Sequence, residues 1–226
     1  MQTVSELWKA LWKTEGTEVE YRFTINGIVY GSDAEVSHNV KRKIYDNFSF
    51  GNAECAMLQL EIYADDIPKG AKIVRECRLV NGSQASEWIP KGTFYTSTRT
   101  EEDGLWDITA YDLMRRGDAV WKPSQSDTFL MPMKDAVERL RKAIDPDLEL
   151  DERCEISETY QVDFPPSDQT IRQTLRYIAA AHLSNWIITE ENKLLLVPLL
   201  SLPEGTGYLV NEYGNPITFG GVRILV

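Results

Sequence analysis

The stretch from Glu18 to Tyr111 repeats one pattern, in which short runs of alternating polar and apolar residues are separated by turn-forming pairs. Asn26-Gly27 lies between two β-rich runs and Asn81-Gly82 ends another, and an Asn-Gly pair between such runs is the strongest short signal for a hairpin. A further turn is expected at Glu101–Gly104. Strands of this length at regular spacing, with few helices, predict a β-barrel or a β-sandwich.

The run 56–62 shows the alternation most clearly. One face carries Ala56, Leu58, Leu60 and Ile62, and the other carries Met57, Gln59 and Glu61. Successive side chains of a strand point to opposite faces, so we expect the leucines to face the core. Gln59 and Glu61 are then expected on the opposite face.

The first residues, TVSELWKALWK (3–13), predict a short amphipathic helix of about three turns. Thr3 and Glu6 have the spacing of a capping box, with Thr3 as the N-cap. The apolar face carries Trp8 and Trp12, which is a large hydrophobic area for so short a helix. Two interpretations are open: the helix packs on its own domain, or it docks on a neighbouring subunit.

Helical periodicity replaces the strand pattern after the Pro- and Ser-rich stretch WKPSQSDTFLMP (121–132). A first helix is expected to bury Val137, Leu140 and Ile144 and to end at Pro146. A second is expected to have Ser167 or Asp168 as its N-cap and a buried stripe of Ile171, Leu175, Ile178, Ala179 and His182. The segment NWIITEENKLLLVPL (185–199) then predicts a hairpin.

These patterns divide the chain into four parts: an N-terminal amphipathic helix (1–15), the first part of a β-barrel (16–122), an inserted α+β domain (123–198) and strands that return to the barrel (199–226). The last part is too apolar to form an exposed edge, so residues 206–226 are expected to be buried against the rest of the fold. Gly220-Gly221 would mark a bulge or a tight turn. The predicted fold class is mainly β with a helix-helix-hairpin insertion.

The charge of the chain argues against general attraction to nucleic acid, because the formal net charge is −11 and the pI is about 4.8. The one basic cluster, His38–Asp46, is interpreted as a solvated loop or strand edge. No apolar run reaches the roughly 20 residues that span a bilayer, and the first residues do not resemble a secretory signal. Three widely spaced cysteines indicate neither disulfides nor a zinc site, and favour synthesis in a reducing cytoplasm.

Few residues suit catalysis. The only histidines are His38 and His182, and a histidine on an apolar helix face is usually a packed residue. No nucleophile elbow, phosphate loop, zinc-protease motif or calcium loop is present.

Carboxylate pairs are the remaining candidates. Asp107/Asp112 and Asp65/Asp66 could be compared with a glycosidase dyad, but such pairs arise by chance among 35 acidic residues. Asp33, Asp65 and Asp66 lack the spacing of a dedicated cation site. No catalytic, cofactor-binding or metal-binding residue is therefore predicted, and the chain is not expected to be an enzyme.

An ordered series of segments resembles the hub proteins at the tip of phage tails and of related contractile injection machines. The segments are SELWKALW (5–12), SFGNAECAMLQLEI (49–62), AKIVRECRLV (71–80), SEWIPKGTFYTSTR (86–99) and LWDITAYDLMRRGD (105–118). The later stretch TIRQTLRYIAAAHLSNWIITEENKLLLVPL (170–199) is similar to the inserted α/β module of the same proteins.

The resemblance implies a tail-tube-like barrel and a structural role in a phage or prophage tail, without a catalytic centre. It implies that residues 206–226 return to the barrel after the insertion and pair with strands of the region 18–111, and that Gln59 and Glu61 face a lumen or a partner. It implies a homo-oligomeric ring, a trimer, that continues the tail tube, touches other tail or baseplate proteins and lets DNA pass without specific binding. The implied location is the virion tail, after synthesis in the bacterial host cytoplasm. The alternative is a carbohydrate- or surface-binding β module, with Trp88, Trp106 and Trp121 stacking on sugars. A cell-wall hydrolase is disfavoured by the missing motifs.

Overall fold

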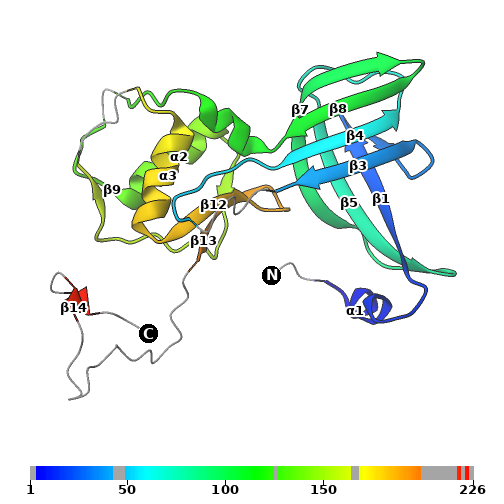
Figure 1. Cartoon of the computed structure of the whole chain (residues 1–226), viewed down its shortest axis with the longest axis horizontal. Helices are drawn as coiled ribbons and strands as arrows, with labels where there is room; N and C mark the ends of the chain where they lie inside the picture. The colour runs from blue at the N-terminus through cyan, green and yellow to red at the C-terminus, as the bar shows by residue number, and fades with distance from the viewer. Residues whose placement is uncertain are drawn as a thin grey trace.

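The computed structural model describes residues 4–42, 49–124, 127–163 and 168–199, together with the strand residues 218–219 and 222–223. Within these ranges the chain forms two units, each around its own buried core. Figure 1 shows a curled antiparallel sheet beside a smaller unit built of helices and short strands.

The first unit is an eight-stranded antiparallel sheet with the order β2-β1-β5-β7-β8-β4-β3, in which the short strand β6 pairs with β5 alone. Its strands are β1 (Glu18–Ile25), β2 (Ile28–Tyr30), β3 (Glu35–Lys41), β4 (Met57–Tyr63), β5 (Lys72–Asn81), β6 (Gln84–Ala85), β7 (Ile89–Glu102) and β8 (Leu105–Tyr111). The mainly β class predicted from the sequence is confirmed.

The predicted turns lie where the sequence places them. Asn26 and Gly27 join β1 to β2 with φ angles of 48° and 87°, and Asp103 and Gly104 join β7 to β8 with 52° and 80°. Two successive positive φ angles are the geometry of the tight turn that matches strand twist. The alternation is also confirmed, because Ala56, Leu58, Leu60 and Ile62 are all buried in the sheet core.

Bulges curl the sheet. Two residues of β7, Lys91 and Gly92, lie opposite the single residue Arg75 of β5, and Gly92 has a φ of 123° that favours glycine. Further register shifts occur between β3 and β4 and between β7 and β8. The curl brings β3 over β1, with the rings of His38 and Tyr21 4.4 Å apart.

Hydrogen bonding among the described strands nevertheless ends at β2 and β3, so the sheet is open where the sequence predicted a barrel.

The N-terminal helix α1 (Glu6–Trp12) is shorter than predicted and begins later. Its N-cap is Ser5, not Thr3, because the Ser5 hydroxyl accepts a hydrogen bond from the Trp8 amide. Ser5 also donates to Glu87 through its amide and its hydroxyl, at 2.7 and 2.6 Å. Leu11 is buried, whereas Trp12 is 69% exposed. The helix is therefore anchored on its own domain, and one of its two tryptophans faces outward.

The second unit combines helices with short strands. Its elements are the 3₁₀ helix η1 (Leu113–Asp118), β9 (Met131–Pro132), α2 (Met133–Ile144), β10 (Glu149–Leu150), β11 (Gln161–Val162), α3 (Ile171–Ala181), β12 (Ser184–Ile188) and β13 (Lys193–Pro198). The predicted helices and hairpin are confirmed, and Val137, Leu140, Ile144, Ile171, Leu175, Ile178 and Ala179 are buried as expected. His182 was predicted wrongly as part of the buried stripe, because it is the half-buried C-cap that follows α3. The cap of α3 was predicted wrongly: Thr170 and Gln173 form a capping box there.

A segment before β4 belongs to the second unit by its contacts. Asn52 accepts a hydrogen bond from the Trp186 amide at 2.8 Å and donates its own amide to the Asn185 side chain at 2.8 Å. Ala53 forms a parallel bridge with Trp186 and is fully buried in the second core. Leu113, Met114 and Trp121 also lie in that core, although they precede the expected boundary at residue 122. The segment 51–55 therefore acts as an extra strand beside β12.

The C-terminal segment is described at four residues only. β14 (Thr218–Phe219) pairs with β15 (Val222–Arg223) in an antiparallel hairpin. The other residues of this segment lie outside the described ranges. The return of residues 206–226 to the sheet and the role of Gly220-Gly221 therefore stay predictions.

Candidate functional site

The outer surface of β3, β4, β8 and β7 carries two cross-strand rows of polar side chains, which we call the polar face. The strand register places one residue of each strand in each row. The rows are Ser37, Glu61, Asp107, Thr100 and Asn39, Gln59, Thr109, Thr98. Neither row contains a lysine or an arginine.

Two carboxylates lie directly opposite each other on the polar face. Glu61 of β4 pairs in register with Asp107 of β8, and like charges in that position repel. The Ser37 hydroxyl donates to Glu61 at 2.9 Å, but no described lysine or arginine forms an ion pair with either carboxylate. These side chains surround a shallow hollow of about 250 Å³. The two rows of the polar face thus carry two opposed carboxylates, and among the described residues no lysine or arginine forms an ion pair with them.

The outer surface of β1 and β5 is arranged in the opposite way, and we call it the paired face. Arg22 donates to both carboxylate oxygens of Glu76, at 2.7 and 3.1 Å, and Arg78 donates to Glu20 at 2.7 Å. Trp88 lies between the two guanidinium groups, whose Cζ atoms are 4.4 and 4.6 Å from its ring centroid. The charges of this face therefore neutralise one another.

The tryptophans expected to stack on sugars are occupied by the protein itself. Both arginines of the paired face cover Trp88. Trp106 donates its ring N–H to the Ala64 carbonyl at 2.9 Å, with the Arg99 guanidinium 5.4 Å from its centroid. Trp121 is 5% exposed. They do not form a free aromatic platform.

Both histidines use both ring nitrogens in packing. His38 contacts Glu35 through Nδ1 and accepts from Arg75 Nη2 through Nε2 at 2.9 Å. His182 donates from Nδ1 to the Ile178 carbonyl at 2.8 Å and accepts the Ser157 amide at Nε2 at 2.9 Å. Each ring is therefore held in place by the protein's own groups. Lys43 to Asp46 of the basic cluster lie outside the described ranges.

The carboxylate pairs do not form a dyad. Asp107 is exposed on the outer side of β8, whereas Asp112 follows the strand on its inner side and is 5% exposed. Asp65, Asp66 and Asp33 lie exposed in loops. Among the residues that the structure describes, no group of three or more His, Cys, Asp or Glu side chains could hold a metal ion.

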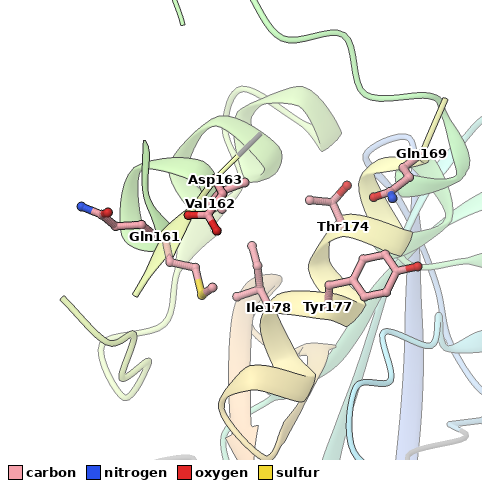
Figure 2. A pocket seen from close by; sticks show the side chains of 8 residues that line it. Gln161, Val162, Asp163, Gln169, Thr174, Tyr177 and Ile178 are labelled. Carbon is pink, nitrogen blue, oxygen red and sulfur yellow. The ribbon is translucent and has the colours of Figure 1, made fainter. Parts of the chain in front are cut away.

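A second hollow, of about 330 Å³, lies between α3 and β11 (Figure 2). Thr174, Tyr177 and Ile178 line it from the helix, with Val162 on the opposite side. Tyr177 is 66% exposed. Its lining is mostly apolar and offers no convergent set of acids, bases or nucleophiles.

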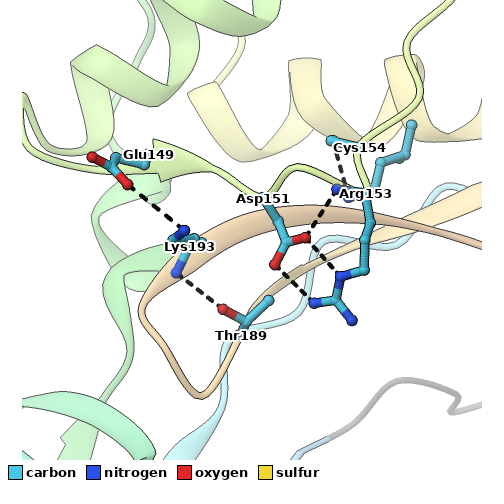
Figure 3. A network of polar contacts seen from close by, with 7 residues as sticks. Glu149, Asp151, Arg153, Cys154, Thr189 and Lys193 are labelled. Atoms are coloured by element: carbon cyan, nitrogen blue, oxygen red, sulfur yellow. Dashed lines mark hydrogen bonds and ion pairs between the residues drawn. The ribbon is translucent and has the colours of Figure 1, made fainter. Parts of the chain in front are cut away.

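The polar network around Asp151 is structural (Figure 3). Arg153 donates to Asp151 from its amide, Nε and Nη2, at 3.1, 2.7 and 2.7 Å, and these hydrogen bonds hold the pKa of Asp151 at about 2. The Asp151 amide donates to the Leu194 carbonyl at 2.9 Å, and Cys154 Sγ accepts from the Leu196 amide at 3.4 Å. The segment that follows β10 is thus hydrogen-bonded to strand β13.

Sequence reasoning found Gln59 and Glu61 but missed the rest of the polar face and the arginines around Trp88. Alternation within one strand assigns a residue to a face, but cross-strand rows depend on register and on bulges between strands distant in sequence. The run 56–62 could be interpreted alone, whereas the pairing of Glu61 with Asp107 could not.

Solved structures with a similar fold include three tail proteins. The 43 kDa tail protein of prophage MuSo2 from Shewanella oneidensis matches with a TM-score of 0.54 and 11% identity, over 85% of this chain and 59% of that one. A tail protein from Neisseria meningitidis MC58 matches with 0.51 and 15%, over 80% and 51%. Prophage tail protein gp18 from Listeria monocytogenes EGD-e matches with 0.50 and 8%, over 79% and 50%.

The chain thus shares its fold with phage and prophage tail proteins and spans between half and three-fifths of their length. No protein-family model and no curated protein sequence matches it. None of the described helices is long and apolar enough to cross a membrane.

Proposed function

We propose that the chain is a structural, non-enzymatic component of a phage or prophage tail, at the baseplate hub or tail tip. Copies would form a ring, a trimer, that continues the tail tube, with the curled sheet as its barrel-like unit. The fold shared with three tail proteins supports the tail assignment. The position at the hub and the ring are our inference from the order of the segments.

The polar face carries the second part of the proposal, which is that it lines the channel. DNA passing through a tube must not bind its wall, and phosphates bind where lysine and arginine are available. The polar face has two opposed carboxylates, Glu61 and Asp107, and no cation in its two rows. Trp88 and the arginines of the paired face would then point away from the channel. Acidic walls repel the phosphates and keep the DNA mobile.

The alternative, a carbohydrate- or surface-binding β module, is less well supported. Sugar binding by stacking needs an exposed ring face, and Trp88, Trp106 and Trp121 are covered or buried.

Complementation of a deletion in the phage or prophage that carries the gene tests the proposal. Without the chain, complete tails should not form. The double variant Glu61→Lys/Asp107→Lys should still assemble tails but lower the infective titre by about tenfold or more, because lysines in the channel bind phosphates. Glu18→Lys/Asp66→Lys makes the same charge change at exposed positions off the polar face and should retain the titre. Normal tails without the chain would contradict the proposal.

A further inference from the structure

The chain passes between the two units at two points, which we call crossings. The two crossings are hydrogen-bonded to each other, and the carboxyl group of one residue joins them. The first crossing enters β4 at Ala56, and the second leaves β8 at Asp112. The Asp112 amide donates to the Ala56 carbonyl at 3.1 Å, and the Ala56 amide donates to Asp112 Oδ2 at 2.9 Å. Oδ1 of the same side chain accepts the Met114 amide at 3.0 Å and caps η1. Asp112 therefore binds the start of the sheet strand and the start of the second unit together.

The surroundings of Asp112 do not supply a dedicated counterion. The side chain is 5% exposed, and no described lysine or arginine forms an ion pair with it. Arg172 of α3 contacts Asp118 and lies 3.7 Å from Cys55 Sγ, while Arg42, after β3, is 3.7 Å from Glu190. The charges that act on the carboxyl are those of Arg42 and Arg172, and the carboxyl in turn acts on the Cys55 thiol. Beyond this first layer, Arg115 and Asp118 also act on Cys55, and Glu190 lies by Arg42.

Burial has the largest influence on the pKa of Asp112. It raises the pKa of Asp112 to about 7, against the two backbone hydrogen bonds and the arginines, which lower it. A carboxyl that meets water when the crossings separate has an ordinary pKa, close to 3.8. Closed and open junctions therefore differ in how many protons they bind.

We propose that Asp112 is a proton-linked latch: the closed junction holds a proton on this carboxyl, and separation of the two crossings releases it. The stabilisation of the closed junction is complete below the ordinary pKa and is lost as the pH rises to the raised one. Opening should therefore become easier between about pH 4 and pH 7 and then level off. The two units would be held most firmly in acid and more loosely at neutral pH.

Amide hydrogen exchange of the full chain tests the latch. After correction for intrinsic rates, protection of the Ala56 and Asp112 amides should fall by about tenfold per pH unit between pH 4 and 7 and stay constant above pH 7. Asp112→Asn has no proton to release and should give a flat profile. Asp107→Asn, an exposed position on the preceding strand, should keep the wild-type slope.

Three results would overturn the latch: a flat wild-type profile, a slope that survives in Asp112→Asn, or an equal loss of protection at the core amides of Leu60 and Leu140. The last would mean that the proton stabilises the whole fold. If Asp112→Asn does not fold, the carboxyl carbon resonance of Asp112 in the wild-type chain decides the question. It should titrate near pH 7, and a midpoint near pH 4 would refute the proposal.

Discussion

The polar face and the paired face lie on different strands of the same curled sheet, yet their charged side chains are arranged in opposite ways. On the paired face each arginine lies across from a glutamate, and Trp88 fills the space between the guanidinium groups. On the polar face Glu61 lies across from Asp107. Folding alone favours the first arrangement, because opposite charges in register stabilise a sheet and like charges destabilise it. The polar face therefore carries a cost that folding does not explain, and this supports a role in function.

The largest change in the free energy of unfolding is expected at the bulge that curls the sheet between the two faces. A Cβ at Gly92 would lie 2.8 Å from the Phe94 ring, at a φ of 123°. Gly92→Ala should lower the free energy of unfolding by about 2–4 kcal/mol, through backbone strain and overpacking. Thermal or urea unfolding measures the loss.

Gly104→Ala is the matched control, because that glycine also has a positive φ but nothing lies within 4 Å of its Cβ position. Its cost should be about 1 kcal/mol. Equal losses at the two glycines would mean that the bulge does not determine the curl.

The next effect concerns the centre of the paired face. Trp88→Ala removes a half-buried ring and two cation–π contacts, and should cost about 2 kcal/mol in urea unfolding. Trp12→Ala removes the same side chain from a position that is 69% exposed and should cost well under 1 kcal/mol. A larger loss for Trp12 would show that α1 holds the monomer together through that ring.

The smallest expected changes in the free energy of unfolding come from removing one carboxylate, and they should differ in sign between the two faces. Glu76→Gln removes the carboxylate that binds Arg22 in two places and should cost about 1 kcal/mol. Glu61→Gln removes the repulsion from Asp107 and should stabilise the chain by a few tenths of a kcal/mol. Paired unfolding curves at low and high salt measure both, and the difference should shrink at high salt. Destabilisation by Glu61→Gln would show that the opposed carboxylates are compensated.

Local patterns in the sequence predicted the elements well. Alternation in 56–62 and the Asn-Gly and Asp-Gly turns depend on neighbouring residues, and all of them lie as expected. The helix caps failed because several Ser, Thr and Asp residues precede each helix, and the capping geometry that selects Ser5 and Thr170 involves contacts such as that of Ser5 with Glu87.

Long-range features could not be predicted from a single sequence. The segment 51–55 precedes β4 by a few residues, yet it pairs with Trp186, more than a hundred positions away. The expected barrel was inferred from strand spacing, whereas closure depends on bulges and on how the edge strands β2 and β3 meet. The polar face could not be predicted for the same reason, since its rows depend on the register between strands.

Electron cryomicroscopy of the assembled tail tests the central claim most directly, because it shows which way each face of the sheet points. The account predicts a ring of chains with Glu61 and Asp107 toward the axis, and with Trp88, Arg22 and Arg78 turned away from it. A ring in which the paired face lines the channel, or a tail in which the polar face is buried against another protein, would contradict it.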